Sequence, residues 1–502
     1  MPESNLKQKV VKGTCWVLME RFSTQLVVFG VGIVLARLLS PTDYGTVALL
    51  GIFTALAGVL ADSGFGGALI QKKDATELDY NSVFYLSLVL SSVLYGVLFL
   101  IAPWVACFYK IEELCPILRV VSISLIFNSI NSIQNAELSR KLLFHLSFKI
   151  SIITTITSAV CGITLACLGF GVWTLVWTGL ITSIVSVVSR WFIIAWRPRL
   201  MFSWAALKPL WRYGWKMTCS ALLDTGFNNL YGLIIGKYYS RADLSFVNKG
   251  RHLPELLMSN VNGTLGRVAF PALAKLQEER IKLRESMRRM MVVSTFFVFP
   301  LMTVCAITAK NTILFLYGEQ WVFAAPYAMI ACFTFALWPF HTINLQGIQA
   351  LGRSDVFLKL EIIKKTIALT VLISCLSQSV LLWCIVGMGV TSPLSVMINA
   401  WPNRKLLDYT LKMQLRDVCP MAIICAIVAI PLLAMNFIPC ETQLMRFAIL
   451  SSQGGIGVVL FVGLSILFRL RGIREVTNML SPRMRAQIPF AIHLFNYLEK
   501  HA

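Results

Sequence analysis

The sequence predicts an all-α polytopic membrane protein with about fourteen transmembrane helices. Three observations support this fold class. Of the 502 residues, 57% are hydrophobic and only 14% are charged, whereas a soluble domain averages about 25% charged residues. Apolar stretches long enough to cross a bilayer follow one another along almost the whole chain. The excess of basic residues, which gives a net charge of +21, lies mainly in alternate loops, as the positive-inside rule describes.

Each predicted span is a mostly apolar stretch of roughly 20 residues, the length needed to cross the bilayer core. In the first half these are Cys15–Ala36, Gly45–Ala61, Val83–Ala102, Ile117–Ile133, Phe148–Leu168 and Val172–Trp196. In the second half they are Met217–Ile235, Leu253–Ala272, Met291–Ala309, Pro326–Leu345, Ile362–Leu376, Val380–Ala400, Val418–Phe437 and Leu444–Phe468. They leave little room for an extramembrane domain.

The distribution of basic residues predicts that both chain termini are cytoplasmic. The basic positions on this side are Lys7–Lys12, Lys72–Lys73, Arg140–Lys141, Arg197–Arg212, Lys275–Arg289, Arg353, Arg404–Arg416 and Arg469–Arg485. The opposite loops carry few cations, except for a cluster from Lys237 to Arg251 that topology does not explain. Because an anionic lipid surface accounts for most of the positive charge, we expect no nucleic-acid partner.

The sequence lacks three motifs that are typical of enzymes. It has no phosphate-binding loop, no His-Glu-x-x-His and no nucleophile elbow, so we expect no ATP hydrolysis and no enzymatic activity. A membrane polymerase or glycosyltransferase is the rival from another class. The thirteen cysteines are scattered and form no C-x-x-C pair, which predicts small apolar side chains rather than a metal site. Cys107 and Cys115, which flank one outer loop, remain candidates for a disulfide.

A faint internal repeat divides the chain into two halves. Ile33–Asp43 resembles Leu233–Asp243, and Ser40 and Asp43 align with Ser240 and Asp243. An offset of about 200 residues predicts two six-helix lobes related as parallel repeats, followed by two C-terminal helices. This is a transporter architecture with a substrate site between the halves.

The predicted organisation has seven parts. These are a cytoplasmic N-terminus (1–12), a first lobe (13–196), an amphipathic interlobe linker (197–216), a second lobe (217–402), a cytoplasmic loop (403–417), two additional helices (418–468) and a basic cytoplasmic tail (469–502). In the linker, Trp204, Leu207 and Trp211 follow the i, i+3, i+7 spacing of a helix face. This spacing predicts a short helix lying in the membrane interface.

An ordered set of motifs resembles one transporter family. The motifs are Leu35–Gly45, Asp62–Asp74, Gly169–Val176, Trp196–Leu200, Leu233–Ser240 and Phe270–Gln277. In order and spacing they are similar to those of the Wzx/WzxC-like flippases of lipid-linked oligosaccharides, such as O-antigen and other polysaccharide precursors. These flippases belong to the multidrug/oligosaccharidyl-lipid/polysaccharide exporter superfamily. The resemblance covers roughly residues 11–413 and departs at Leu244–Gly250, where Lys249 takes the place of an arginine.

The resemblance implies a two-lobed fold of fourteen helices in the bacterial inner membrane. The implied activity is movement of an undecaprenyl-pyrophosphate-linked oligosaccharide from the cytoplasmic to the outer leaflet by alternating access, coupled to an ion gradient. Membrane lipids and a polysaccharide polymerase or co-polymerase are the implied partners. No cofactor is expected, apart from Na⁺ or H⁺ as a coupling ion. A multidrug or small-cation exporter of the same superfamily is the alternative.

Cations within or beside the spans are candidates for binding the substrate headgroup, because a charge in the membrane is costly and usually functional. The candidates are Arg21, Lys149, Lys249, Arg251 and Arg267. For Arg21, whose neighbour is Glu20, a local ion pair or snorkelling is the alternative. Asp224, with Asn228 four residues later, is the candidate for ion coupling, because a carboxylate and an amide on one helix face can bind sodium or exchange a proton.

Overall fold

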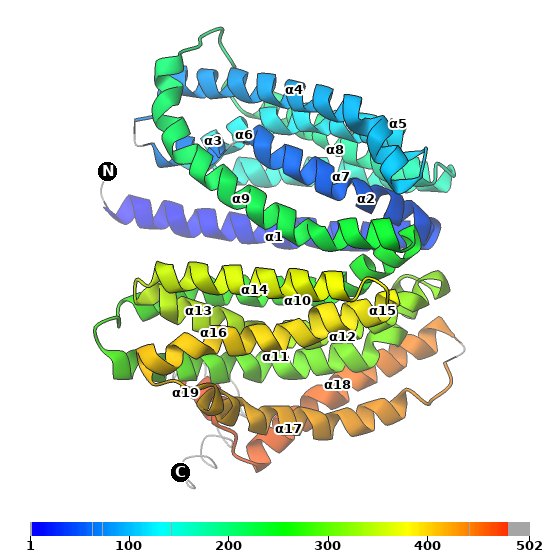
Figure 1. Cartoon of the computed structure of the whole chain (residues 1–502), viewed down its shortest axis with the longest axis vertical. Helices are drawn as coiled ribbons and strands as arrows, with labels where there is room; N and C mark the ends of the chain where they lie inside the picture. The colour runs from blue at the N-terminus through cyan, green and yellow to red at the C-terminus, as the bar shows by residue number, and fades with distance from the viewer. Residues whose placement is uncertain (1–2, 63, 73, 142, 441, 480–502) are drawn as a thin grey trace. The chain divides into compact units, whose positions relative to one another are not determined.

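A computed structural model describes residues 3–62, 64–72, 74–141, 143–440 and 442–479. Within these ranges every regular element is a helix, which confirms the predicted fold class (Figure 1). Eleven of the described helical stretches are long and apolar enough to cross a membrane. Each predicted span is mostly helical, and some, such as 380–400, are divided over consecutive helices. The spans predicted at 217–235, 253–272 and 362–376 are not among the eleven. The number fourteen therefore stays a prediction.

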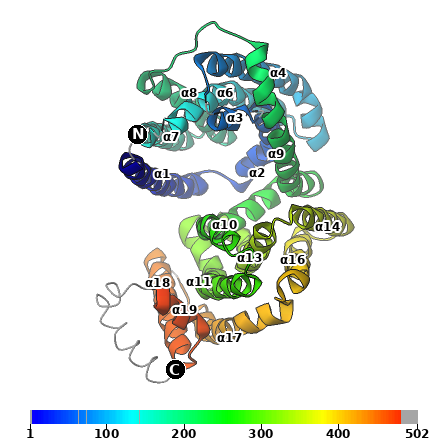
Figure 2. The same cartoon turned by 90° about the vertical axis from the view of Figure 1, so that its left-hand side faces the viewer.

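The chain forms two compact units, Met1–Ser245 (unit 1) and Phe246–Ala502 (unit 2). Unit 1 contains α1 (Glu3–Leu38), α2 (Pro41–Asp62), α3 (Phe65–Gln71), α4 (Glu77–Tyr109), α5 (Leu114–Ser122), α6 (Ser124–Arg140), α7 (Phe144–Cys167), α8 (Val172–Ile193), α9 (Trp204–Tyr238) and the first turn of α10 (Arg241–Ala274). Within it, α1 packs on α7, α7 on α8, and α9 on α2, α3 and α4 (Figures 1 and 2).

Unit 2 continues from the rest of α10. Its elements are α11 (Arg280–Leu316), the 3₁₀ helix η1 (Glu319–Ala324), α12 (Ala325–Ala336), α13 (Trp338–Ala350), α14 (Ser354–Ser374), α15 (Val380–Cys384), the π-helix η2 (Ile385–Val390), α16 (Thr391–Leu407), α17 (Leu411–Met435), α18 (Gln443–Leu467) and α19 (Arg471–Met479). The long α11 packs against α12, α17 and α18. The predicted basic tail is described as far as Met479, and 480–502 lie outside the described residues.

The two repeated segments have the same local conformation. After α1, Ser40 Oγ donates to Asp43 Oδ2 (2.6 Å), and the Asp43 N–H donates back to Ser40 Oγ (3.2 Å). After α9, Ser240 and Asp243 make the same two hydrogen bonds, at 2.6 and 3.1 Å. In each pair the serine N–H also donates to the aspartate Oδ2, at 2.9 and 3.1 Å, so the two residues form a reciprocal cap that satisfies two backbone N–H groups at the start of a helix. The repeated serine and aspartate thus end one long helix and begin the next.

The predicted linker differs from the structure in one respect. The segment from Trp204 onward is not a separate interfacial helix but the start of α9, which continues to Tyr238. Ser203 begins the helix, because its Oγ accepts a hydrogen bond from the Ala206 N–H (3.4 Å). Leu207 is 2% exposed and belongs to the apolar core of unit 1, so this part of the helix is held by packing as well as by the cap. The lobe boundaries proposed from the sequence stay a prediction.

Apolar packing forms the core of each unit. In unit 1 the largest described cluster joins residues of α3, α4, α6 and α9, and includes Phe65, Val83 and Ile133. In unit 2 one cluster joins α10, α11, α13, α16 and α17 around Met287 and Tyr409. Cys107 and Cys115 are free thiols, so the candidate disulfide between them is not formed in this structure.

Candidate functional site

Helix α6 carries a row of polar side chains inside a membrane span, which we call the α6 stripe. Its members are Ser124, Asn128, Ser129, Asn131 and Ser132. Neighbouring helices supply partners: Ser91 Oγ of α4 hydrogen-bonds Ser129 Oγ (3.0 Å), and Ser186 Oγ of α8 donates to Asn131 Oδ1 (3.3 Å). Polar groups in a membrane span pair across helices or line a cavity because lipid offers them no partner. The α6 stripe therefore marks the polar interior of unit 1.

Asp62, the last residue of α2, faces the α6 stripe. Its Oδ1 accepts a hydrogen bond from Ser132 Oγ (2.6 Å). The carboxylate also lines two cavities, one of about 340 Å³ between α2 and α6 and one of about 490 Å³ between α2, α3 and α9. Both cavities include Ala55 and Gly58 in their walls. We call these spaces the Asp62 cavities.

Two glycines that follow Asp62 leave room for this arrangement. A Cβ on Gly66 would lie 3.1 Å from Ser132 Oγ and 3.4 Å from Asp62 Oδ1. Gly64 has φ +66°, and a Cβ there would lie 2.7 Å from the Gly214 carbonyl oxygen of α9. A left-handed conformation and such close approaches both favour glycine. They explain why glycine occupies positions 64 and 66.

Among the residues that the structure describes, those lining the Asp62 cavities offer hydrogen-bonding groups and no set of metal ligands. The residues that line the smaller cavity include Asp62 of α2 and Asn128, Ser129 and Ser132 of α6, all of which carry side-chain oxygens. A carboxylate accepts hydrogen bonds only, whereas hydroxyl and amide groups both donate and accept. This combination suits a ligand with many hydroxyl groups, and hydrogen bonds to the ionised carboxylate are the stronger ones.

A second set of interacting polar side chains connects α1, α7 and α8 of unit 1. Ser151 Oγ of α7 donates to Glu20 Oε1 of α1. The Glu20 carboxylate also interacts electrostatically with Arg190 of α8, whose Nε donates to Ser186 Oγ (3.4 Å). Glu20 therefore has partners on two other helices, a contact that its position beside Arg21 in the sequence did not indicate.

Four of the predicted site residues lie in unit 1, and all four side chains are exposed. Arg21 and Lys149 lie on α1 and α7, which pack together. Asp224 and Asn228 lie one turn apart on α9, so they share a helix face as the spacing predicts. The described walls of the Asp62 cavities contain none of the four. Their roles in binding and coupling stay predictions.

The other predicted residues lie on α10. Lys249 Nζ lies 4.8 Å from the Tyr317 ring centroid. The Arg251 guanidinium lies 6.0 Å from the Phe335 ring centroid, and its Nη1 is 3.8 Å from Met388 Sδ. Both cations thus lie within cation–π distance of an aromatic ring. The side chain of Arg267 falls outside the described part of the structure, as do those of Asn260 and Asn262.

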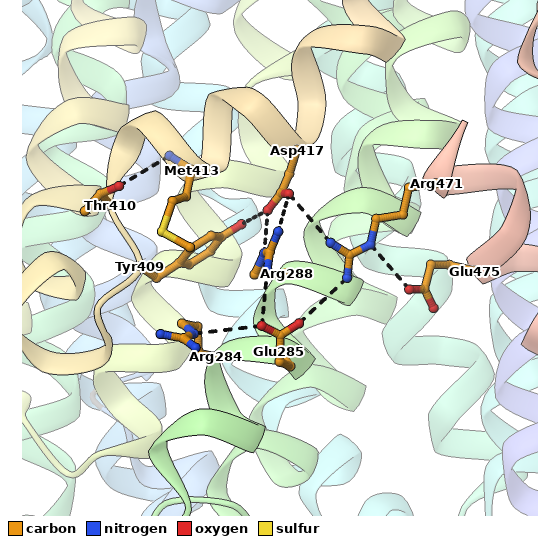
Figure 3. A network of polar contacts seen from close by, with 9 residues as sticks. All are labelled: Arg284, Glu285, Arg288, Tyr409, Thr410, Met413, Asp417, Arg471 and Glu475. Atoms are coloured by element: carbon orange, nitrogen blue, oxygen red, sulfur yellow. Dashed lines mark hydrogen bonds and ion pairs between the residues drawn. The ribbon is translucent and has the colours of Figure 1, made fainter. Parts of the chain in front are cut away.

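Unit 2 contains a network of charged side chains that joins α11, α17 and α19 (Figure 3). Arg288 binds Asp417 with two parallel hydrogen bonds, Nε to Oδ2 (2.9 Å) and Nη2 to Oδ1 (2.8 Å). Arg471 Nη1 lies 3.6 Å from Asp417 Oδ1, and its Nε lies 3.5 Å from Glu475 Oε1. We call this group the Asp417 network. It connects α19 to the helix bundle.

Tyr409, in the turn between α16 and α17, completes the Asp417 network. Its hydroxyl donates to Asp417 Oδ2 (3.3 Å). Burial raises the pKa of Tyr409 well above its usual range, and the Asp417 carboxylate acts in the same direction. The phenol therefore stays protonated and remains a hydrogen-bond donor. Together, Arg288 and Tyr409 donate hydrogen bonds to both carboxylate oxygens of Asp417. The Asp417 side chain is only 7% exposed.

Asp62 is the residue that sequence reasoning missed. It stands at the end of an apolar stretch, where it appeared only as the first residue of a motif. A cluster of polar residues elsewhere in the sequence could have pointed to it. The five polar residues of the α6 stripe all occur within Ser124–Ser132, inside the span predicted at 117–133. Such a cluster in a span requires a polar partner or cavity.

The chain is similar to proteins that are named for polysaccharide biosynthesis. The family model described as "Polysaccharide biosynthesis protein" matches residues 34–326. The lipopolysaccharide biosynthesis protein WzxC of Escherichia coli (strain K12) is 23% identical over 370 residues, which cover 72% of this chain and 74% of that protein. The teichuronic acid biosynthesis protein TuaB of Bacillus subtilis (strain 168) is 23% identical, with coverages of 70% and 73%. The succinoglycan biosynthesis transport protein ExoT of Rhizobium meliloti (strain 1021) is 24% identical, with coverages of 65% and 66%.

Solved transporters share the fold. The inward closed conformation of the lipid II flippase MurJ superposes with a TM-score of 0.70 at 12% identity, covering 90% of this chain and 98% of that one. An inward-facing multidrug-resistance transporter of the MATE family superposes with a TM-score of 0.57 at 15% identity, covering 76% and 95%. These likenesses concern the fold alone, and they confirm the predicted all-helical membrane-transporter architecture.

Proposed function

We propose, from the premise that this chain belongs to the polysaccharide biosynthesis protein family, that it flips a lipid-linked oligosaccharide across the membrane. The sequence relatives are named for polysaccharide biosynthesis and transport rather than for a catalysed reaction, and the chain is not an enzyme. The observation that carries the proposal is the Asp62 cavities, because they bring saccharide-binding groups into a membrane-embedded helix bundle.

In this proposal the saccharide hydroxyls bind Asp62 and the α6 stripe. Moving a sugar across a bilayer requires polar partners for hydroxyl groups that lose water, and unpaired polar groups in an apolar medium cost several kcal/mol. The Asp62 carboxylate supplies hydrogen-bond acceptors, and Asn128 and Ser129, which line the same cavity, supply both donors and acceptors. Small residues such as Ala55 and Gly58 leave room for a bulky ring.

The cationic candidates form the second part of the proposal. Arg21 and Lys149 in unit 1, and Lys249, Arg251 and Arg267 in unit 2, bind the polyprenyl-pyrophosphate headgroup during transport. A pyrophosphate carries negative charge that needs charge-assisted hydrogen bonds when it leaves water. The exposure of Arg21 and Lys149 supports this role, because neither side chain is enclosed in the core.

We further propose the direction, the orientation and the energy source of transport. The substrate moves from the cytoplasmic to the outer leaflet of the bacterial inner membrane by alternating access, with both chain termini in the cytoplasm. Asp224 and Asn228 bind the coupling ion, either Na⁺ or H⁺, because both side chains are exposed on one face of α9. The first lobe (13–196), the linker (197–216) and the second lobe (217–402) are the moving parts.

The substitution Asp62→Asn tests the saccharide site. We expect it to slow flipping roughly tenfold to a hundredfold, because hydrogen bonds to a charged group are worth about 1.5–3 kcal/mol. The measurement is transfer of a fluorescent polyprenyl-pyrophosphate oligosaccharide in reconstituted vesicles. The label is quenched from outside by an impermeant reagent.

Asp74→Asn is the matched control. Asp74 is exposed in the loop after α3, so the same change in charge there should leave the flipping rate unaltered. Flipping by the Asp62→Asn protein at the rate of the Asp74→Asn protein would contradict the assigned site. If wild-type protein flips no lipid-linked saccharide, the proposed function itself is wrong.

One observation favours a second function, export of small organic cations. The described walls of the Asp62 cavities contain a carboxylate and no basic residue, an arrangement that also suits a cationic ligand. Under this hypothesis, vesicles with the protein transport ethidium, and Asp62→Asn abolishes that transport. Ethidium transport without saccharide flipping would replace our proposal by this one.

A further inference from the structure

An apolar pocket of about 520 Å³ lies in unit 1, where the first turns of α9 pack against α3 and α4. We call it the α9 pocket. Its apolar walls come from Phe65, Leu86, Leu90, Trp204, Leu207 and Trp211, and Lys208 is the one charged residue among the described lining residues. It shares no described lining residue with the Asp62 cavities, so it is a separate site.

The α9 pocket has a buried floor and an exposed aromatic rim. Phe65 and Leu207 are 1% and 2% exposed, whereas Trp204 and Trp211 are 69% and 53% exposed. Exposed tryptophans on membrane proteins gather at the level of the lipid headgroups, where the ring is apolar and the indole N–H reaches water. The rim therefore places the mouth of the pocket at the boundary between acyl chains and headgroups.

Lys208 adds a positive charge to this rim. It lies on α9 four residues from Trp204 and three from Trp211, so the three side chains share one helix face. The side chain of Lys208 is exposed, and the described residues that line the pocket include no carboxylate. An ammonium group beside an apolar slot is complementary to a lipid that has an anionic headgroup and an apolar chain.

We propose that the α9 pocket binds one acyl chain of an anionic glycerophospholipid, with the headgroup phosphate at Lys208 Nζ. The volume falls within the range of about 300–1,000 Å³ that ligand sites occupy. A single lysine is a point charge that suits one phosphodiester, whereas a pyrophosphate calls for several forked donors. Phospholipids also form the solvent around the pocket, which favours their binding by mass action. This lipid is a bound ligand of the protein and not its transported substrate.

The substitution Lys208→Gln tests the headgroup contact. The full-length protein in a mild detergent is titrated with phosphatidylglycerol and with phosphatidylcholine of the same acyl chains, and bound lipids are counted by native mass spectrometry. We expect wild-type protein to prefer phosphatidylglycerol about fivefold at one site, and Lys208→Gln to lose that preference, since one lysine contributes about 1 kcal/mol. Lys405→Gln, a change at an exposed lysine of α16, should keep it.

The substitution Leu90→Trp tests the acyl chain. Leu90 is half-buried in the pocket wall, so a larger ring fills the slot while Lys208 stays in place. We expect this variant to lose the tightly held lipid, whichever headgroup is offered. The proposal is overturned if Lys208→Gln keeps the preference, or if Leu90→Trp keeps the lipid. It is also overturned if a polyprenyl pyrophosphate displaces the phosphatidylglycerol, because the pocket would then belong to the carrier lipid.

Discussion

The substitution Asp417→Asn is expected to lower the thermal stability of unit 2 substantially. The Asp417 carboxylate accepts two hydrogen bonds from Arg288 and a third from Tyr409, and an asparagine would turn an NH₂ group toward at least one of these donors. The Asp417 and Arg288 side chains are 7% and 23% exposed, and removing one partner of a largely buried ion pair costs roughly 3 kcal/mol. In a unit of this size, that cost lowers the unfolding midpoint by roughly 6–12 °C. Thermal unfolding of the detergent-solubilised protein measures the effect.

Asp355→Asn is a closely matched control for this prediction. Arg353 binds Asp355 with the same two-bond geometry, Nε to Oδ1 and Nη2 to Oδ2, both at 2.9 Å. Here the two side chains are 47% and 52% exposed, and exposed ion pairs contribute little to stability because water screens them. We expect an unchanged unfolding midpoint. Equal effects of the two substitutions would show that the Asp417 network does not stabilise unit 2.

The second large effect is expected from Gly45→Ala in α2. A Cβ on Gly45 would lie 2.0 Å from the Arg241 carbonyl oxygen and 2.6 Å from its carbonyl carbon, distances that the backbone cannot accept without moving. The same contact is held by the Ser245 hydroxyl, which donates to the Pro41 carbonyl (2.5 Å). Overpacking of this kind costs about 1–3 kcal/mol or more. We expect a lower unfolding midpoint and less folded protein after purification.

Gly51→Ala, also in α2, provides the comparison. A Cβ on Gly51 would lie more than 4 Å from every atom other than those of its two chain neighbours and of the adjacent backbone of its own helix. Alanine is favoured over glycine in a helix by about 1 kcal/mol, so this variant should unfold at the same temperature as wild type or slightly above it. If Gly45→Ala is as stable as Gly51→Ala, the close approach of α2 to Arg241 is not needed for folding.

Local sequence signals predicted the helical fold and some of its boundaries. The apolar stretches predicted helices because a bilayer accepts only segments that satisfy their own backbone hydrogen bonds. The repeat of Ser40 and Asp43 at Ser240 and Asp243 coincides with equivalent helix starts, since a reciprocal cap needs residues only three positions apart. Apolar stretches and helix caps depend only on residues close together in the chain, so the sequence is enough to predict them.

The candidate sites depended on contacts between distant residues. Ser132 pairs with Asp62, although seventy positions separate them in the chain. Glu20 binds Ser151 of α7, whereas the sequence drew attention to its neighbour Arg21. A membrane charge could be recognised from the sequence as costly, but its partner could not.

The sequence alone determined that this chain is a helical membrane protein with the motifs of a polysaccharide transporter family, because composition, apolar runs and ordered motifs are properties of the chain itself. The tertiary structure decided which polar groups form sites. It brought Asp62 to the α6 stripe and joined Asp417 to Arg288 and Arg471. It also turned the start of α9 into one wall of a pocket. Helix packing sets these contacts, since each depends on the relative position and rotation of helices far apart in the chain.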